Sequence, residues 1–412
     1  MLYHPFCYIG YFMFDTLQLL PADPILNLVV ECKADDNPDK VDLGAGVYKD
    51  ASGHTPIMAA VQAAQTQLQQ EETTKTYVSP AGLLGFNQGM ISLLLGESHP
   101  AINDQRVIGV QAPGGCGALN IAGHLIKRCN QNPQTPATVW ISTPTWANHI
   151  PLLSSCGLQL REYPYYDDET QGINFDAMME GLERITAGDV VLLHGCCHNP
   201  SGADLTQEQW RTVAALLNEK GAIPFVDVAY QGLGDGLEQD AWGMRYLAEH
   251  CPEMIIASSC SKNFGLYRER VGEVVVIAKS PTAAQISHGQ LLSIARGIYS
   301  MPPNHGAALV DIILHDAVLS QQWQTELTTM RERIAGLRVS LVKQLQAAGA
   351  GSRFDYIQHE KGMFSFLGVN PEQVNRLKQE HSIYMVNSSR ISVAGLSSNN
   401  MQYVVQSLMK VL

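Results

Sequence analysis

Short apolar runs alternate with amphipathic stretches through the middle of the chain. Runs of this length that are almost entirely apolar are typical of strands buried on both faces, and helical stretches between them are typical of βαβ units. The pattern predicts an α/β fold in which a mostly parallel, seven-stranded sheet is covered by helices on both faces. The expected strands are 106–111, 137–142, 158–166, 189–194, 222–227, 253–259 and 273–278.

One of the intervening helices carries signals at both ends. Thr206 and Gln209 have the spacing of a capping box ahead of the apolar-periodic stretch 210–217. Gly221 follows the last periodic residues, where a left-handed residue commonly ends a helix. These signals predict a helix between Thr206 and Gly221.

The pattern changes beyond about Leu319. A long, charged, amphipathic helix is expected at 322–348, followed by short strand-like pieces at 362–366 and 390–394 and by a terminal helix from Asn399. This change of texture predicts a second, smaller domain at the C-terminal end of the chain.

The N-terminal part is expected to complete that small domain. An amphipathic stretch at 25–34 reads as a helix, and 41–48 reads as a strand interrupted by Gly44 and Gly46. Glycine inside a strand marks a bulge or the close approach of a ligand or another backbone. The predicted division is an N-terminal extension and arm at 1–26, a large domain at 56–325, and a small domain made of 27–55 and 326–412.

Composition restricts the class of partner. The 412 residues carry a net charge of −12, which argues against nucleic acid or an anionic membrane as the main partner. Charged residues are only 16% of the chain, which favours an oligomer. Nine cysteines without CxxC spacing indicate reduced thiols and a cytoplasmic protein. Residues 1–14 match neither a signal peptide nor a membrane span, and Met13 is a possible natural start.

Lys262 leaves the expected strand 253–259 at its carboxyl end, where open α/β sheets place their ligands. A lysine enclosed there near another cation, such as Arg270, could lose its proton and form an imine with a carbonyl compound. The alternative is a solvated lysine in a loop.

A glycine-rich turn, 113–119, follows the first expected strand and opens an amphipathic helix. Free backbone amides at such a helix start can hold a phosphate group, with Gly115 and Cys116 at the turn. The turn matches neither the dinucleotide-binding nor the P-loop pattern. A tight helix start without a ligand remains the alternative.

Asp227 ends another apolar run, and Tyr230 follows three residues later. A carboxylate at a buried strand end needs a cation, which a protonated pyridine nitrogen would supply. A tyrosine nearby could bond an oxygen on the same ring. The alternative is an aspartate that caps the following turn.

The segment 194–202 places two histidines and two cysteines close together, which resembles a metal site. Vicinal cysteines fit poorly around one tetrahedral zinc ion, so we do not predict a metal. Asn199 could instead donate to a ring oxygen, and Trp146, after another strand, could stack on a planar ring or simply pack in the core. Phosphate cradle, pyridinium acceptor and imine-forming lysine jointly suit pyridoxal 5′-phosphate.

From about Phe14 to the C-terminus, the sequence resembles the class I aminotransferases of fold type I, in particular the aspartate and aromatic amino-acid aminotransferases. The similarity rests on 22–26 (ADPIL), 43–48 (LGAGVY), 196–202 (CCHNPSG), 227–232 (DVAYQG), 261–267 (SKNFGLY) and 269–272 (ERVG). The resemblance implies a homodimer with shared active sites that uses pyridoxal 5′-phosphate.

The resemblance also implies roles for individual residues. Lys262 would form the Schiff base and carry the proton, Asp227 would pair with the pyridinium, and Tyr230 and Asn199 would bond the ring oxygen. Trp146 would stack on the ring, with His149 behind Asp227. The phosphate would be held by Gly115, Cys116, Ser259, Ser261, Arg270 and, from the partner subunit, Tyr77.

Two arginines are implied to bind substrate. Arg390 would clamp the α-carboxylate in bidentate fashion, with help from the backbone amide of Gly46. Arg296 would reach across the dimer to the side-chain carboxylate of aspartate or glutamate. Three residues depart from the family pattern, namely Cys116, Ser389 and Ala45, and the last two leave the choice between aspartate and aromatic donors open.

The expected function is transfer of an amino group from L-aspartate, and from aromatic amino acids, to 2-oxoglutarate by a ping-pong mechanism. The first alternative is an aromatic amino-acid aminotransferase, since Arg296 can swing away in this family. The others are a PLP-binding regulator without catalysis, which would need a DNA-binding segment before Asp23, and a catalytically dead interaction protein.

Overall fold

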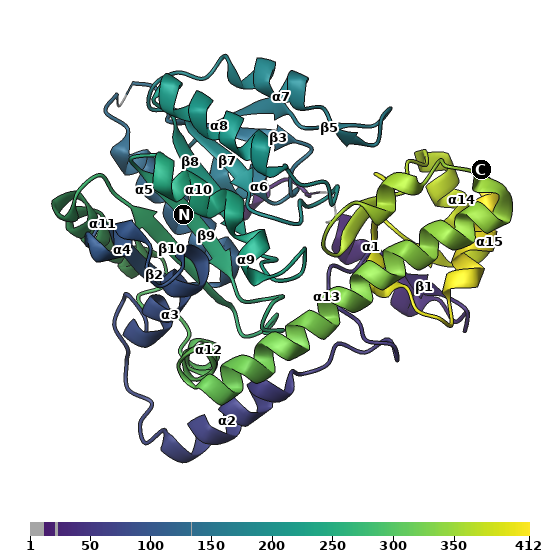
Figure 1. The fold of residues 1–412 in the computed structure, drawn as a ribbon, viewed down its shortest axis with the longest axis horizontal. Helices are drawn as coiled ribbons and strands as arrows, with labels where there is room; N and C mark the ends of the chain where they lie inside the picture. Colours follow the sequence, from purple (N-terminus) through teal and green to yellow (C-terminus); the bar gives the residue numbers. More distant parts are fainter. Residues whose placement is uncertain (1–11, 21–23, 133) are drawn as a thin grey trace, which may run out of the picture.

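A seven-stranded sheet lies at the centre of the larger, left-hand part of the protein in the computed structural model, which describes residues 12–20, 24–132 and 134–412 (Figure 1). The strand order is β2-β10-β9-β8-β7-β3-β4, and only β10 runs antiparallel to its neighbours. The seven predicted strands are confirmed. They are β2 (Val107–Pro113), β3 (Thr138–Thr143), β4 (Gln159–Pro164), β7 (Val190–His194), β8 (Ile223–Val228), β9 (Met254–Ser259) and β10 (Val271–Ile277).

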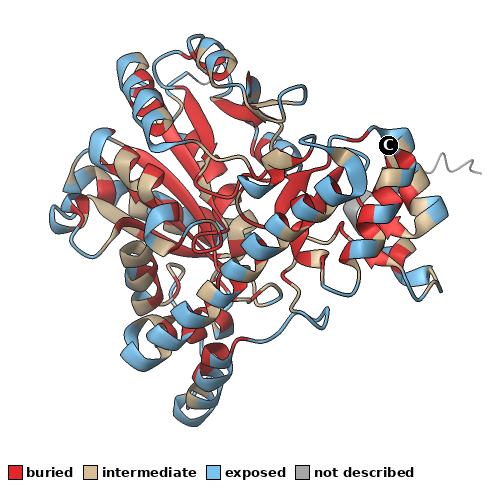
Figure 2. Ribbon diagram, turned by 45° about the vertical axis from the view of Figure 1, so that its right-hand side comes forward, coloured by how far each residue is buried: buried red, intermediate tan, exposed pale blue. Residues whose placement is uncertain are grey.

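Both faces of this sheet are buried, as the apolar runs predicted (Figure 2). Neighbouring residues of one strand join different cores: Ile256 packs with helices α8 (Gln207–Lys220) and α10 (Trp242–His250), and Ala257 packs with α5 (Gly114–Cys129) and α11 (Pro281–Ile298). This alternation is the two-residue period of a strand between two layers of helices.

The capping signals of α8 are confirmed. The Thr206 hydroxyl accepts from the backbone N–H of Gln209 at 3.3 Å, and the Gln209 side chain accepts from the N–H of Thr206 at 2.9 Å. Gly221 ends the helix with a left-handed backbone at φ 66°.

A long helix, α13 (Ala317–Leu345), runs from α2 (Ala59–Glu71) and α12 (His305–His315) to the C-terminal part of the chain (Figure 1). It confirms the predicted helix 322–348, although a turn of π-helix at Gln346–Ala350 ends it. Beyond it, β11 (Phe364–Phe366) pairs antiparallel with β13 (Arg390–Ser392), and the chain ends in α15 (Met401–Val411).

The N-terminal residues join this C-terminal part through a short strand. β1 (Val41–Asp42) pairs in parallel with β12 (Ile383–Tyr384). The longer strand expected at 41–48 was wrong, because Asp42 Oδ1 accepts from the backbone N–H groups of Gly44 at 3.0 Å and Ala45 at 3.1 Å and turns the chain. The residue bounds of the predicted small domain stay a prediction.

The run 158–166 is also shorter than expected, because β4 ends at Pro164 and a separate strand, β5, begins at Tyr166. The remaining elements are α1 (Pro24–Ala34), α2 (Ala59–Glu71), α3 (Leu84–Leu95), α4 (Pro100–Asn103), α6 (His149–Ser155), α7 (Phe175–Leu182), α9 (Leu237–Asp240), α12 (His305–His315), α14 (Pro371–His381), β5 (Tyr166–Asp167) and β6 (Gly172–Ile173), with 3₁₀ turns at Met13–Thr16, Asp355–Gln358 and Val393–Gly395.

Much of the predicted arm, at 1–11 and 21–23, lies outside the described residues. The described stretch 12–20 has exposed apolar side chains, among them Phe14, Leu17 and Leu20. Within the ranges that the structure describes, no helix combines the length and apolar character needed to cross a membrane.

Candidate active site

One pocket opens at the carboxyl edge of the central sheet, where β8 and β9 end and α5 begins. Its walls bring together ten of the residues that the sequence singled out: Gly115, Cys116, Trp146, Asn199, Asp227, Tyr230, Ser259, Ser261, Lys262 and Arg270. These residues come from five separate segments of the chain, so their convergence is a property of the fold.

Lys262 lies in the turn after β9, with its Nζ 4.7 Å from the centre of the Tyr230 ring. Burial lowers the pKa of Lys262, and the positive charge of Arg270 lowers it further, while Asp227 and Cys116 act in the opposite direction. A lowered pKa makes the neutral, nucleophilic amine more accessible at neutral pH.

Asp227 lies on β8, with its Oδ2 accepting from His149 Nε2 at 3.0 Å. His149 Nδ1 in turn faces the Thr145 hydroxyl at 2.8 Å. Burial raises the pKa of Asp227, but the hydrogen bond from His149 and the nearby charges outweigh this, so the pKa is lowered overall. The pocket therefore presents a charged carboxylate that is oriented from behind.

The start of α5 forms an anion cradle with the loop between β9 and β10. A Cβ on Gly115 would lie 3.2 Å from the Ser259 Cβ, and a Cβ on Gly114 would lie 2.5 Å from Arg270 Nη2, so the glycines permit this close approach. The Ser259 hydroxyl bonds the Ser261 hydroxyl at 3.0 Å. Free amides, hydroxyls and one guanidinium together suit a phosphate group.

Arg390, on β13, borders a second cavity that shares Trp146 and Asn199 with the first. Its guanidinium donates to Asn199 Oδ1 at 3.3 Å and to the Gly44 carbonyl at 3.0 Å, and it lies 4.5 Å above the ring of Phe364. Its Nε is buried and has no hydrogen-bond partner among the described residues. Arg390 is therefore a buried cation with one unused donor, and burial also lowers its pKa.

Comparison with known proteins agrees with this geometry. Residues 38–408 match the family model for aminotransferases of class I and II. The chain belongs to this family. It is 47% identical over 401 residues to the aspartate aminotransferase of Haemophilus influenzae, covering 97% of this chain and all of that one. It is 44% identical to the aromatic-amino-acid aminotransferase of Pseudomonas aeruginosa, covering 97% and 98% of the two chains.

Solved structures are also similar to this chain. An aromatic-amino-acid aminotransferase from Burkholderia pseudomallei, covalently bound to pyridoxal phosphate, superposes with a TM-score of 0.95 at 39% identity. The comparison covers 98% of this chain and all of that one. The protein is thus an aminotransferase of fold type I, and its cofactor is pyridoxal 5′-phosphate.

The residues present fit that cofactor. The cradle at Gly115 has amides and hydroxyls for the phosphate, and Arg270 adds a positive charge. Asp227, charged and held by His149, would face the ring nitrogen. Asn199 lies close enough to bond the Tyr230 hydroxyl, and both would flank the ring oxygen. Cys116 accepts from Asn148 Nδ2 at 3.6 Å and offers a thiol at the start of α5.

Besides Arg390, three predicted residues of this aminotransferase lie outside the first pocket. Gly46 lies beside the Phe364 ring that also contacts Arg390, since a Cβ on Gly46 would lie 3.1 Å from that ring. Tyr77 is 91% exposed, and Arg296 is exposed near the end of α11, where it bonds the Ser300 hydroxyl. The single chain does not bring Tyr77 or Arg296 to its own pocket, and their roles in a partner's site stay a prediction.

Sequence reasoning missed His194 and Phe364. His194 pairs in register with Asp227 and faces the Thr145 hydroxyl at 3.2 Å, and burial lowers the pKa of His194 to about 3. Its position at the end of the strand next to that of Asp227 could have indicated that His194 lies at the site. From the sequence alone, His194 was considered only as a possible metal ligand. Phe364 lies under Arg390 and had no signal in the local pattern.

Proposed function

We propose that this aminotransferase transfers the amino group of L-aspartate, and of aromatic amino acids, to 2-oxoglutarate by a ping-pong mechanism. The observation that carries the proposal is Arg390, a buried cation with an unused Nε and no acidic partner among the described residues. Such a group is costly unless an anion completes it, and the α-carboxylate common to amino and 2-oxo acids has the matching planar geometry.

Lys262 is the residue that moves the proton. When bound, the cofactor would withdraw electrons from the substrate Cα. The Lys262 amine would take the Cα proton and deliver it to the cofactor C4′ within the same half-reaction, and it would move a proton in the reverse direction in the second half-reaction. The lowered pKa of Lys262 favours the free amine that this step needs. Asp227 keeps a negative charge opposite the ring nitrogen, and the His149 hydrogen bond holds it there.

The finer assignments extend this proposal. A homodimer, in which Tyr77 serves the phosphate and Arg296 the second carboxylate of the partner's substrate, is supported by the exposure of both side chains in the single chain. A cytoplasmic location is supported by the free thiols of the eight described cysteines.

An aromatic amino-acid aminotransferase is the second candidate function. The relatives include proteins named for aromatic amino acids at 42–44% identity. The second cavity, bordered by Met385, Asn387 and Ser388, extends beyond Arg390 and provides room for a larger side chain. Its size and these residues favour a pocket that accepts both kinds of donor.

The deciding experiment measures kcat/KM for aspartate, tyrosine and phenylalanine at one fixed 2-oxoglutarate concentration. A large preference for aspartate means that Arg296 stays in place as the reader of the second carboxylate. Comparable or higher values for the aromatic donors would make the second candidate the main activity.

Replacing Lys262 tests the mechanism itself. Lys262→Ala is expected to lower kcat by at least roughly 10⁴-fold, because no other described amine lines the pocket. The visible absorbance of the covalently held cofactor should disappear as well. Normal transamination by this variant would refute the proposal, and an inactive wild type would point to the regulator or the interaction protein.

A further inference from the structure

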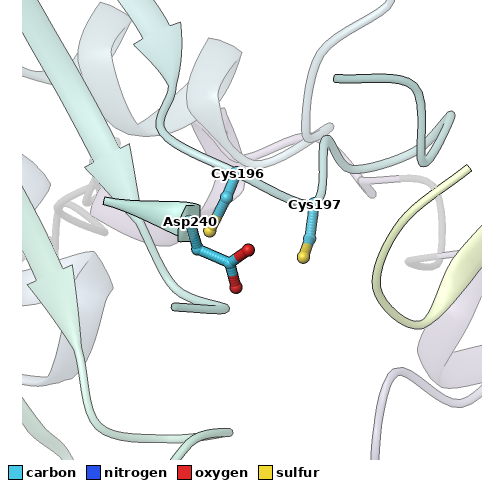
Figure 3. A group of neighbouring side chains, drawn as sticks. All are labelled: Cys196, Cys197 and Asp240. Atoms are coloured by element: carbon cyan, nitrogen blue, oxygen red, sulfur yellow. The ribbon is translucent and has the colours of Figure 1, made fainter. Parts of the chain in front are cut away.

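Two adjacent cysteines after β7 form an unusual cluster near the cofactor pocket. The sulfur atoms of Cys196 and Cys197 and a carboxylate oxygen of Asp240 lie within 4.8 Å of one another (Figure 3). Cys197 has φ +52°, a left-handed conformation that few non-glycine residues adopt. Both cysteines are buried, at 6% and 2% exposure.

Asp240 is already committed to the fold. Its Oδ2 accepts from the backbone N–H groups of Gly232 at 2.8 Å and Gly234 at 2.9 Å, and its Oδ1 accepts from Asp235 at 2.7 Å. A zinc ion would have to draw this carboxylate away from the loop that it anchors. The part of the cluster that is free to react is therefore a pair of thiols.

The state of these thiols selects the chemistry. The hydrogen bond with Cys197 lowers the pKa of Cys196, but burial outweighs it and raises this pKa to about 11. The hydrogen bond with Cys196 and burial both raise the pKa of Cys197. Both thiols are therefore protonated at neutral pH, so the pair carries two protons that can leave together with an oxygen atom as water.

The dithiol lies beside the cofactor pocket. Cys196 lines the pocket that also holds Asn199 and Lys262. Cys197 packs behind it, with its sulfur 4.0 Å from the Tyr230 carbonyl oxygen and its Cβ against Gly362. A molecule that fills the pocket would therefore cover the dithiol.

We propose that Cys196 and Cys197 form a dithiol site for trivalent arsenicals, which opens through the cofactor pocket so that cofactor and arsenical exclude each other. The arsenic atom forms two As–S bonds, and its oxygen leaves as water with both thiol protons, so arsenic stays trivalent. The mutual exclusion of cofactor and arsenical rests on the proposed assignment of the pocket to the cofactor.

The experiment treats the purified protein with phenylarsine oxide before and after removal of the cofactor, and measures the adduct by intact mass spectrometry. The cofactor-free protein should gain one arsenical per chain and lose two titratable thiols. Cofactor at 100 times its Kd should slow this reaction roughly 100-fold, since only the unoccupied pocket reacts. A dithiol such as 2,3-dimercaptopropanol should remove the adduct, whereas a monothiol should not.

Variants locate the site. Cys196→Ala and Cys197→Ala should each abolish the stable adduct, whereas Cys116→Ser, which alters another thiol of the same pocket, should keep it. Peptide mapping of the wild-type adduct gives the same answer if either alanine variant fails to fold.

Three results would overturn the proposal: no adduct on the cofactor-free protein, an adduct that survives Cys197→Ala, or equal rates with and without cofactor. Adduct formation requires no turnover. A protein that bound the arsenical but transferred no amino group would refute the proposed function and leave the dithiol site standing.

Discussion

Arg338 and Arg390 are both buried beside strand β11, at 2% and 6% exposure, yet their surroundings differ. Arg338, on α13, donates to several partners of its own fold: the carbonyls of Ile357, Lys361, Gly362 and Phe364, the Glu360 carboxylate and the Ser365 hydroxyl. Arg390 has two acceptors and a buried Nε without a partner in the described part of the chain.

The difference separates an arginine whose donors are used within the fold from one that keeps a buried donor unused. An arginine whose donors are used by carbonyls and a carboxylate holds a loop together. An arginine that is equally buried but has an unused donor has lost its hydration without a full set of hydrogen bonds in exchange. An incoming anion would supply the missing hydrogen bonds. Burial alone would not have distinguished the two residues, whereas the number of unused donors does.

The largest effect is expected at Arg338. Arg338→Met should lower the free energy of unfolding by about 3–5 kcal/mol, because Glu360 and four carbonyls lose their buried partner. Urea unfolding measures this change. Since the loop also carries Phe364, some loss of activity is expected, but a variant of unchanged stability would contradict the structural role.

Arg390 should respond in the opposite way. Arg390→Ala should lower kcat/KM for aspartate roughly 30-fold to 5000-fold, because the α-carboxylate loses its partner. This decrease corresponds to a loss of about 2–5 kcal/mol in transition-state stabilisation. Its unfolding free energy should change far less than that of Arg338→Met. Arg390→Lys serves as the matched control and should recover activity only partly, because an ammonium cannot bind a carboxylate through a planar fork.

A smaller effect, dependent on pH, is expected at Glu360. Burial raises the pKa of Glu360 from 4.5 to about 8, outweighing the attraction of Arg338. A carboxyl whose pKa is higher in the folded than in the unfolded state binds more protons when folded. The wild type should therefore lose stability between pH 4.5 and 8, by at most about 1.4 kcal/mol per pH unit.

Glu360→Gln imitates the protonated side chain and should flatten that slope. Thermal unfolding of both proteins at pH 5, 6, 7 and 8 provides the measurement. Parallel curves for the two proteins would show that Glu360 is ionised throughout and would place it in a permanent ion pair with Arg338.

The sequence predicted the central sheet because each strand there is buried on both faces, and such strands are visible as local apolar runs. It predicted Asp227 and Lys262 as candidates for a related reason: a polar residue at the end of an apolar run stands out. The short strands were less predictable. The expected strand 41–48 ends after two residues because one side chain, Asp42, captures two backbone amides.

The cluster around Arg338 had no local signal. Glu360 and Arg338 come from different segments, and nothing in either segment shows that both are buried together. The role of Arg390 came from the family resemblance, because a three-residue strand gives no periodicity to interpret. Tyr77 and Arg296 could not be tested in a single chain, since their expected partners belong to a second subunit.

The antiparallel course of β10 has a consequence for the order of assembly. Because β10 returns along β9, the connection 260–270 carries both Lys262 and Arg270 to the same edge of the sheet. The lysine and the arginine that we propose for the cofactor are therefore close in sequence. The contact between Arg390 and Asn199 instead closes a loop of 191 residues. Since short loops close at lower entropic cost, the end of the site that carries Lys262 and Arg270 should form early during folding, and Arg390 should dock last.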